Sequence, residues 1–315
     1  MRKKLLLVVN PISGKKLAAG YMLHFVDRFD KAGYSVIACC TQKDKSACEI
    51  VINRGADMDL IVCCGGDGTL KETICGVMAL GKDISIGYIP MGTTNDFARA
   101  FGIPIDINKA LEAVLEGVPR PVDIGTFGDE YFNYVAAFGN FTDISYTTSQ
   151  RAKNLLGRGA YFLHSADPFF KMKSYSARVE ADGEVFKGKY FYGSVTNSEC
   201  MGGLPVLKNL GVEFDDGLLE LVLVEMVRNP ADILSIANSL AKKNIGDNKR
   251  IIVRHCKEVR FIFDKPTDFS LDGECAEKIT DVIIKDIKCP VKIIAKSKEL
   301  ITQEDLVAEV MEDLI

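Results

Sequence analysis

The chain has 315 residues, a formal net charge of −4 and a sequence pI of about 5.6. This acidic balance excludes a protein whose whole surface attracts nucleic acid, so an anionic partner has to meet a local basic patch. Because 315 residues, 47% of them hydrophobic, exceed the usual size of one core, we expect two domains.

Strands and helices alternate over the first 120 residues. Apolar runs predict strands over 4–9, 34–40, 59–64 and 84–90, and apolar residues at helical spacing predict helices over 17–32, 46–54, 70–80, 95–101 and 108–116. Gly33, Gly55 and Gly81 are natural ends for the first three helices. Strands that alternate with helices predict an α/β fold with a doubly wound, mainly parallel sheet.

From about residue 121 the pattern changes to period two. Strands are predicted over 175–181, 217–225, 249–255, 259–264 and 281–296, and only 229–244 is a convincing helix. We therefore expect an α/β domain over residues 1–124 and a β-rich antiparallel sandwich over residues 125–299. A predicted helix over residues 300–315 is expected to pack back on the first domain.

The cysteines and the N-terminus favour a cytoplasmic protein. The ten cysteines include no C-x-x-C pair, so zinc is disfavoured, and unpaired cysteines suggest a reducing compartment. The first apolar run has only five residues before Asn10 and Pro11, which predicts a strand rather than a signal peptide. No run approaches the roughly 18 apolar residues of a membrane-spanning helix.

A glycine-rich loop, GGDGT, begins at Gly65, after the third predicted strand and before the third helix. Gly65 and Gly66 allow backbone N–H groups to approach a phosphate, and the helix N-terminus favours an anion. Thr69 and Glu72 have the spacing of a capping box. Asp67 suits such a site if magnesium lies between its carboxylate and the phosphates; alternatively it only shapes the turn.

Two further polar loops end predicted strands of the same sheet. NPISGK, residues 10–15, follows the first strand, and MGTTNDFAR, residues 91–99, follows the fourth. Because ligands bind outside the carboxyl ends of such strands, we expect the three loops to converge on one site. Asp96 adds a second carboxylate, and Asp123, where the domains join, adds a third.

Five motifs, taken together, resemble those of the soluble bacterial diacylglycerol kinases. They are NPISGK, GGDGT and GTTNDFAR, followed by VDIG at 122–125 and LDGE at 271–274. That family includes kinases of other lipids and is similar to the catalytic region of sphingosine kinases. The resemblance covers nearly the whole chain; GGDGT also occurs in NAD kinases, but the set with GTTND is specific. It implies ATP-dependent phosphoryl transfer to a lipid, with the nucleotide between an α/β domain and a β-rich domain.

The resemblance implies a nucleotide site with magnesium. It assigns Asp67, Asp96 and Asp123 to an acidic, water-linked network near the magnesium ion. The residues that it places around the nucleotide are Asn10, Ser13, Gly65, Gly66, Thr69, Gly92, Thr93 and Asn95.

A second, structural magnesium is implied in the β-rich domain, at GVEFDDGLLE. The resemblance gives it the Asp216 side chain and the carbonyls of Glu213 and Leu218. The alternative for this segment is a plain hairpin turn.

A kinase of alcohols needs a carboxylate that takes the proton of the acceptor hydroxyl. The resemblance implies that Glu274 is this base and that Asp272 orients it, with Asp67 as the third catalytic residue. A nearly identical string, ADGE at 181–184, is predicted to be an inert hairpin. Spacing does not separate the two strings, so the roles of Asp272 and Glu274 rest on the resemblance.

Residues 151–173 form a locally basic segment in this acidic chain. Arg151, Lys153, Arg158, Lys171 and Lys173 stand against one acid and alternate with leucine and phenylalanine. This pattern fits a surface that contacts anionic lipid. The alternative is that the aromatic residues belong to the core and the charges are solvated.

The sequence therefore predicts a cytoplasmic lipid kinase, peripheral at the membrane, that uses ATP and Mg²⁺ in phospholipid biosynthesis. The expected reaction converts diacylglycerol to phosphatidic acid; nucleic acid is not an expected partner, and the resemblance implies a homodimer. The alternatives are a kinase of another lipid alcohol such as a sphingoid base, an NAD kinase relative, and a non-catalytic nucleotide- or lipid-binding regulator. GTTND and LDGE disfavour the NAD kinase, and the intact acids disfavour the regulator.

Overall fold

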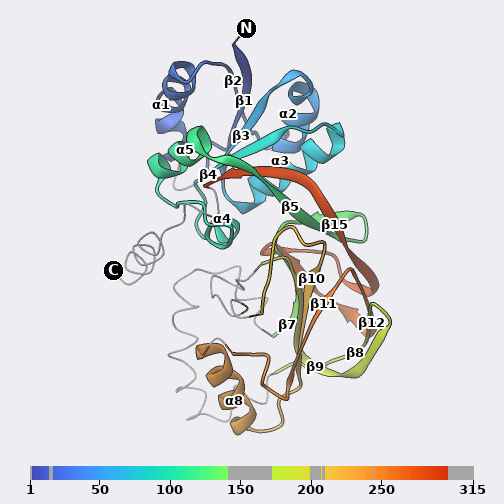
Figure 1. The fold of residues 1–315 in the computed structure, drawn as a ribbon. Helices are drawn as coiled ribbons and strands as arrows, with labels where there is room; N and C mark the ends of the chain where they lie inside the picture. Colours follow the sequence, from blue (N-terminus) through green and yellow to red (C-terminus); the bar gives the residue numbers. More distant parts are fainter. Residues whose placement is uncertain are drawn as a thin grey trace. The chain divides into compact units, whose positions relative to one another are not determined.

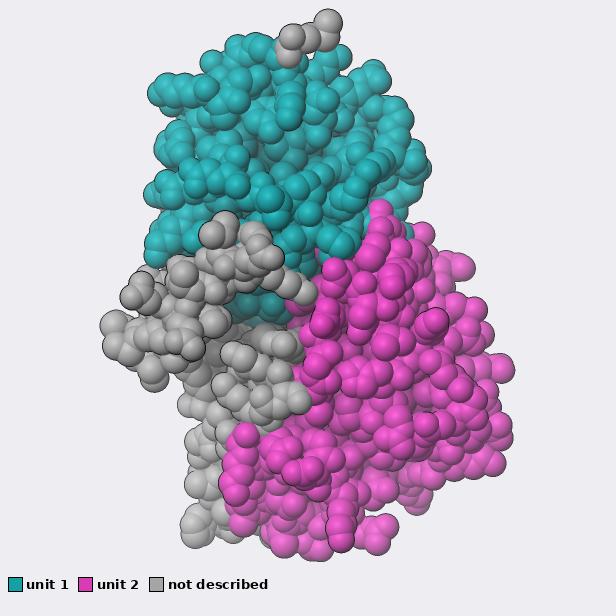
Figure 2. All heavy atoms as spheres, in the orientation of Figure 1, with its two compact units in different colours: residues 1–121, 291–315 teal, residues 122–290 magenta. Residues whose placement is uncertain are grey.

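The computed structural model describes residues 2–13, 17–140, 172–198, 207, 210–242 and 244–296. The chain divides into two compact units, shown in Figure 2: unit 1 comprises residues 1–121 and 291–315, and unit 2 comprises residues 122–290. Whether these units fold as the independent domains expected from the sequence stays a prediction. The expected helix over 300–315 and most of the basic segment 151–173 lie outside the described residues.

A parallel sheet forms the centre of unit 1. β1 (Lys3–Val9) pairs with β2 (Tyr34–Cys40) on one side and β3 (Leu60–Gly65) on the other, and β4 (Ser85–Pro90) pairs with β3. Every residue of β3 is buried, as expected for a continuously apolar strand covered on both faces. The predicted parallel sheet is confirmed.

The strand predicted over 281–296 partly joins this sheet. β15 (Ile279–Ala295) is a single strand of 17 residues, and its last part pairs in parallel with β4 through Lys292, Ile293 and Ile294. The sequence predicts this run for the β-rich half alone, because its apolar pattern does not reveal which sheet it joins.

Helices cover both faces of the unit 1 sheet (Figure 1). α2 and α3 pack against each other, and a Cβ on Gly76 of α3 would lie 2.6 Å from the Cβ of Val51, so this contact requires glycine. Ser46 and Glu49 form a capping box at the start of α2. The helices of unit 1 are α1 (Leu17–Lys31), α2 (Ala47–Arg54), a 3₁₀ turn (Gly55–Asp57), α3 (Asp67–Leu80), α4 (Asp96–Phe101) and α5 (Ile107–Glu116).

Unit 2 is built from antiparallel strands with two apolar clusters among the described residues, which confirms the predicted β-rich half. The rings of Phe138 and Phe263 lie 4.9 Å apart in the first cluster, with Phe261 and Phe269 beside them. Helix α8 (Pro230–Ala241) packs through Ile233, Ile236 and Leu240 against the second apolar cluster, which includes Val222 and Val224. The strands, apart from β15, are β5 (Val118–Phe127), β6 (Glu130–Phe132), β7 (Val135–Gly139), β8 (Tyr175–Ala181), β9 (Glu184–Thr196), β10 (Leu219–Glu225), β11 (Ile251–Cys256), β12 (Glu258–Thr267), β13 (Phe269–Leu271) and β14 (Glu274–Cys275).

Candidate active site

The carboxyl ends of β1, β3 and β4 bring three polar loops together in unit 1. The amide of Asn10 donates a hydrogen bond to the carbonyl of Cys64 at 2.9 Å, and the amide of Met91 donates to the carbonyl of Gly65 at 2.7 Å. β2 and β3 flank β1 on opposite sides, so the strand order reverses between β1 and β3, where ligands of such sheets bind. The predicted convergence of the loops is confirmed.

Two glycines allow the second and third loops to touch. A Cβ on Gly92 would lie 2.6 Å from the Cα of Gly66 and 2.7 Å from Oδ1 of Asn95. Asn95 has a positive φ of 50°, and its Oδ1 accepts a hydrogen bond from the amide of Gly92 at 2.8 Å. This close backbone contact leaves no room for a side chain at position 92.

Asp67 joins the second loop to the start of α4. Its carboxylate accepts hydrogen bonds from the amides of Asp96 at 3.1 Å and Phe97 at 3.2 Å, and from the hydroxyl of Thr94 at 3.3 Å. Because Asn95 makes no side-chain cap, Asp67 caps α4 from another part of the chain. Burial raises the pKa of Asp67, and these hydrogen bonds offset part of the rise.

The predicted capping box of Thr69 and Glu72 is wrong. α3 begins at Asp67, after an extended Gly66, so Thr69 already lies inside the helix. Its Oγ1 accepts a hydrogen bond from Nδ2 of Asn10 at 3.0 Å. The carboxylate of Glu72 accepts from the amide of Ala47 at 2.7 Å and thereby caps α2.

All eight residues expected around the nucleotide lie in these three loops of unit 1 or in the ends of β3 and α3 that border them. The first loop lies at the end of β1, the second joins β3 to α3, and the third joins β4 to α4. The N-terminus of the 14-residue helix α3 and the bare glycine backbone suit a phosphate group. The residues are Asn10, Ser13, Gly65, Gly66, Thr69, Gly92, Thr93 and Asn95.

Asp123, the third expected member of the acidic network, lies in unit 2 and is fully buried. Its Oδ2 accepts a hydrogen bond from the amide of Gly217 at 2.6 Å, and its Oδ1 accepts from the amide of Cys289 at 2.6 Å. Asp123 therefore fastens the turn before β10 to β15. The role of Asp67, Asp96 and Asp123 at a metal stays a prediction.

The turn at Asp216 has the chemistry of a site for a hard cation. Oδ1 of Asp216 accepts a hydrogen bond from the amide of Leu218 at 2.9 Å. Burial, with added repulsion from Asp216, raises the pKa of Glu220 to about 9, and burial with repulsion from Asp123 raises that of Asp286 to about 7. Among the described residues, buried oxygens of both carboxylates accept no hydrogen bond, although Oε1 of Glu220 lies 3.3 Å from Nδ1 of His255.

A bound cation would relieve the repulsion among these carboxylates, so the residues at this turn are compatible with a cation site. No group of three or more His, Cys, Asp or Glu side chains in the described ranges is arranged to hold a metal ion. A site here would therefore depend on carbonyl oxygens, as expected for Glu213 and Leu218, together with the Asp216 carboxylate. The predicted ligand set stays a prediction.

The two D-G-E strings form the same kind of hairpin. Asp272 and Gly273 have φ of 52° and 87° between β13 and β14, and Asp182 and Gly183 have φ of 44° and 93° between β8 and β9. The predicted hairpin at ADGE is confirmed, and LDGE shares its backbone. Backbone conformation does not distinguish the two strings.

Their carboxylates differ in burial. Asp272 is buried and accepts hydrogen bonds from the amides of Asn133 at 2.7 Å, Tyr134 at 3.0 Å and Val135 at 3.1 Å. Asp182 is exposed and accepts from the amides of two residues at the start of β12. Asp272 therefore fixes its turn within the fold, while Glu274 next to it is exposed to solvent. The segment 133–135 was missed because backbone amides leave no signal in a sequence.

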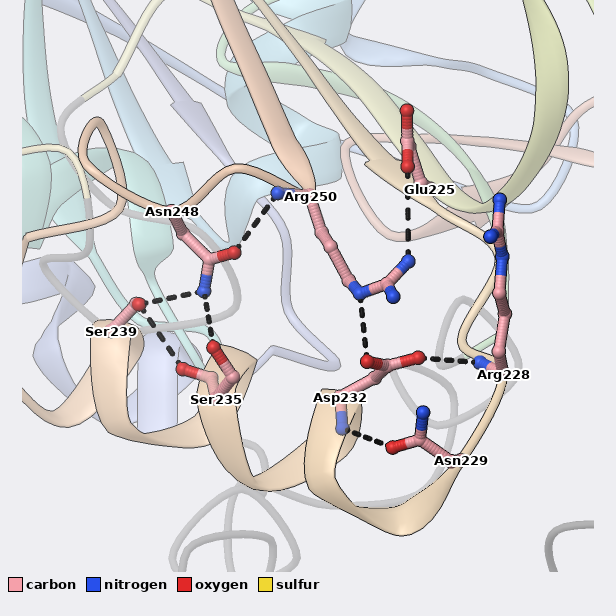
Figure 3. A network of polar contacts seen from close by, with 8 residues as sticks. All are labelled: Glu225, Arg228, Asn229, Asp232, Ser235, Ser239, Asn248 and Arg250. Atoms are coloured by element: carbon pink, nitrogen blue, oxygen red, sulfur yellow. Dashed lines mark hydrogen bonds and ion pairs between the residues drawn. The ribbon is translucent and has the colours of Figure 1, made fainter.

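A second polar network surrounds α8, beside a cavity of about 900 Å³ (Figure 3). Asp232 and Arg250 form an ion pair at 2.8 Å, and Nδ2 of Asn248 donates hydrogen bonds to the hydroxyls of Ser239 at 2.8 Å and Ser235 at 3.2 Å. Burial alone would raise the pKa of Asp232, but the amide of Arg228 and the guanidinium of Arg250 outweigh it and lower the pKa. Because these groups satisfy one another, the network anchors α8 to the neighbouring loop.

Three comparisons place the chain among known proteins. Residues 4–127 match the family described as "Diacylglycerol kinase catalytic domain". A protein of Bacillus subtilis named "Diacylglycerol kinase" is 31% identical over 277 residues, which cover 86% of this chain and 90% of that protein. One of the same name from Staphylococcus carnosus is 34% identical over 278 residues, covering 87% and 89%.

Solved structures agree with the fold. A crystal structure titled as a putative diacylglycerol kinase from Bacillus anthracis has a TM-score of 0.78 and 24% sequence identity, and the match covers 95% of this chain and 97% of that one. Within the residues that the structure describes, no helix is both long and apolar enough to cross a membrane.

Proposed function

Because the chain belongs to the diacylglycerol kinase catalytic domain family, we propose that it transfers the γ-phosphoryl group of ATP to diacylglycerol and forms phosphatidic acid. The observation that supports this most is the identity of 31% and 34% with two proteins named diacylglycerol kinase over most of the chain. The three converging loops of unit 1 add a physical reason, since they form a glycine-lined site at the switch point of a parallel sheet.

In this proposal unit 1 binds the nucleotide. The N-terminus of α3 and the backbone of Gly65 and Gly66 offer N–H groups to the phosphates. Asp67 keeps the second and third loops in register through the amides of Asp96 and Phe97. Magnesium, when bound, would neutralise charge on the phosphates, and Asp67, Asp96 and Asp123 are the acids proposed to be near it.

In this proposal unit 2 provides the general base that acts on the lipid acceptor. The turn that Asp272 fixes holds Glu274 in place, and Glu274 is the proposed general base for the lipid hydroxyl. Asp272 is the proposed positioning residue, and the three backbone N–H groups that donate to its carboxylate support this role. The Asp216 turn is the proposed structural magnesium site.

The proposed partners are ATP, the lipid and an anionic membrane surface that the protein contacts from the cytoplasm. The basic segment 151–173 is the proposed contact, and a homodimer is the proposed assembly. These points rest on the sequence pattern and the family.

The test is a panel of acceptors with labelled ATP: dioctanoylglycerol, a sphingoid base and NAD. We expect label in phosphatidic acid, and the transfer should require Mg²⁺. Preferential label in the sphingoid base or in NAD would show that this acceptor, and not diacylglycerol, is the substrate. Label in none of the three acceptors would reject the proposed kinase activity.

A further inference from the structure

Two neighbouring helices of unit 1 each carry a cysteine at the place where they touch. α2 and α3 lie side by side (Figure 1), with Cys48 in the first turn of α2 and Cys75 in the middle of α3. A Cβ on Gly76 would lie 2.9 Å from the carbonyl oxygen of Cys48, so the bare backbone of α3 meets the backbone of α2 there. The residue next to Cys75 is therefore in contact with Cys48.

A hydrogen bond fixes the same alignment independently. The carboxylate of Glu72 accepts from the amide of Ala47 at 2.7 Å. Glu72 and Cys75 are three residues apart on α3 and so lie on one face, and Ala47 directly precedes Cys48. Both cysteines are free and only partly buried. They thus share one seam between the helices, and a small molecule in the solvent can reach it.

The side chains of the two cysteines also interact electrostatically. The pKa of Cys48 is raised to about 12, first by burial and then by the Cys75 side chain, through hydrogen bonding and charge. Glu72 and Glu49 add smaller repulsion. Because two neighbouring anions repel each other, an ionised sulfur on Cys75 keeps the proton on Cys48. We therefore treat Cys75 as the thiolate of the pair and Cys48 as the thiol.

Neighbouring thiols can hold a metal ion or form a disulfide. Within the described ranges no three His, Cys, Asp or Glu side chains are arranged to hold a metal ion, so a site with four protein ligands is disfavoured. A disulfide needs only two sulfurs, on Cα atoms less than about 7 Å apart, and the backbone contact at Gly76 favours such a distance. Oxidation is therefore the chemistry that this pair fits.

We propose that Cys48 and Cys75 form a reversible disulfide when hydrogen peroxide oxidises the protein. The thiolate of Cys75 attacks one peroxide oxygen, so that an S–O bond forms and the O–O bond breaks. The second oxygen leaves as hydroxide and takes a proton from solvent to become water. In this step the peroxide is reduced by two electrons and Cys75 is oxidised to a sulfenic acid.

The second step closes the bridge. The sulfur of Cys48 attacks the sulfur of Cys75, an S–S bond forms, and the S–O bond breaks. The hydroxyl group leaves as water with the proton of Cys48. This step is open to Cys48 because the sulfenic acid is neutral, so the negative charge that kept the proton on Cys48 is gone.

The bridge fastens α3, which begins at Asp67 in the glycine-rich loop, to α2. A cross-link restricts the unfolded chain, so the oxidised protein is the more stable form. In a reducing compartment such a bridge is transient, because other thiols reopen it. The inference goes beyond the proposed kinase activity and does not depend on it.

The test treats the reduced full-length protein with hydrogen peroxide and maps its peptides without reductant. We expect a peptide that joins Cys48 to Cys75 and is separated by dithiothreitol, and a Tm higher by roughly 5 °C or more. Cys48→Ser should abolish both changes and leave a sulfenic acid on Cys75, which dimedone labels. Cys75→Ser should give much less dimedone label on Cys48, because burial keeps that thiol protonated.

Cys275→Ser is the matched control, because it removes an exposed cysteine of unit 2. It should form the linked peptide as the parent does. The Tm of each reduced variant reports whether it still folds, and the peptide map of the parent needs no substitution. A parent without the linked peptide would overturn the inference and leave the pair as a packing contact. Stronger dimedone label on Cys48 than on Cys75 would overturn the order of the two steps.

Discussion

The carboxylate of Asp67 accepts a hydrogen bond at 3.2 Å from the amide of Phe97, which belongs to a different loop of the same sheet edge. Together with the bond from Asp96 at 3.1 Å, it makes one acid the link between α3 and α4. The acid in the glycine-rich loop thus has a structural role whether or not a metal lies nearby. This relationship changes what a substitution at Asp67 should do.

Asp67→Asn should reduce both activity and stability. One oxygen becomes an NH₂ group that faces an N–H donor, so at least one bond to the start of α4 is lost. We expect a rate loss of roughly a hundredfold, the scale of one electrostatic stabiliser, and a lower Tm. The measurement is lipid phosphorylation beside thermal unfolding. More than half of the parental activity at an unchanged Tm would mean that Asp67 is neither an anchor nor catalytic.

Gly92→Ala should separate the second and third loops. The added Cβ would lie 2.6 Å from the Cα of Gly66, a distance that requires the backbone to move. We expect at least a tenfold weaker affinity for ATP, measured by titration calorimetry, because the phosphate-facing loops lose their register. Gly20→Ala is the control: a Cβ there meets nothing within 4 Å, so ATP affinity should stay at the parental value. Equal affinity in both variants would show that the contact is not needed.

The sequence predicted the elements well where the physical signal is local. The buried strand at Leu60–Gly65 and the helix at Ala47–Arg54 follow from an apolar run and from helical spacing alone. The convergence of the three loops followed from the rule for parallel strands. Asp67 as a cap for α4 did not follow, because its partners are backbone amides that any residue could supply. The contact between Cys48 and the segment of Cys75 was equally invisible, since it depends on how two helices pack.

Asp216→Asn should remove a magnesium-dependent gain in stability. A bound ion stabilises the folded state by mass action, so Mg²⁺ should raise the Tm of the parent protein. The Asn variant should lose most of that gain, because a carboxylate is the strongest ligand proposed for this turn. Asp215→Asn, in the same turn, is the control and should respond to Mg²⁺ as the parent does. An equal response in all three proteins would exclude the ion from this turn.

Glu220 should make the protein less stable as the pH rises. Burial raises its pKa from the ordinary 4.5 to about 9, so the folded state holds the proton more tightly than the unfolded chain. Its contribution to stability is complete below pH 4.5 and is lost as the pH rises toward 9, by at most about 1.4 kcal/mol per pH unit. Glu220→Gln should flatten this slope in urea unfolding without divalent cations. An unchanged slope between pH 5 and 9 would contradict the assignment.

The two D-G-E hairpins provide an internal comparison. Glu274→Gln should bind ATP as the parent does but lose about two orders of magnitude or more in rate, the usual effect of losing positioned proton transfer. Glu184→Gln removes an exposed carboxylate that pairs with Arg254 at 3.0 Å, and exposed pairs of this kind contribute little, so activity should stay within twofold. Both glutamates follow an Asp-Gly turn with the same backbone, so a general effect of the amide would appear in each. Similar losses in both variants, or none in either, would remove Glu274 from the mechanism. A loss confined to Glu274→Gln would show that two turns alike in sequence and backbone differ in function. The structural difference between them is that Asp272 is buried against the amides of 133–135, whereas Asp182 is exposed.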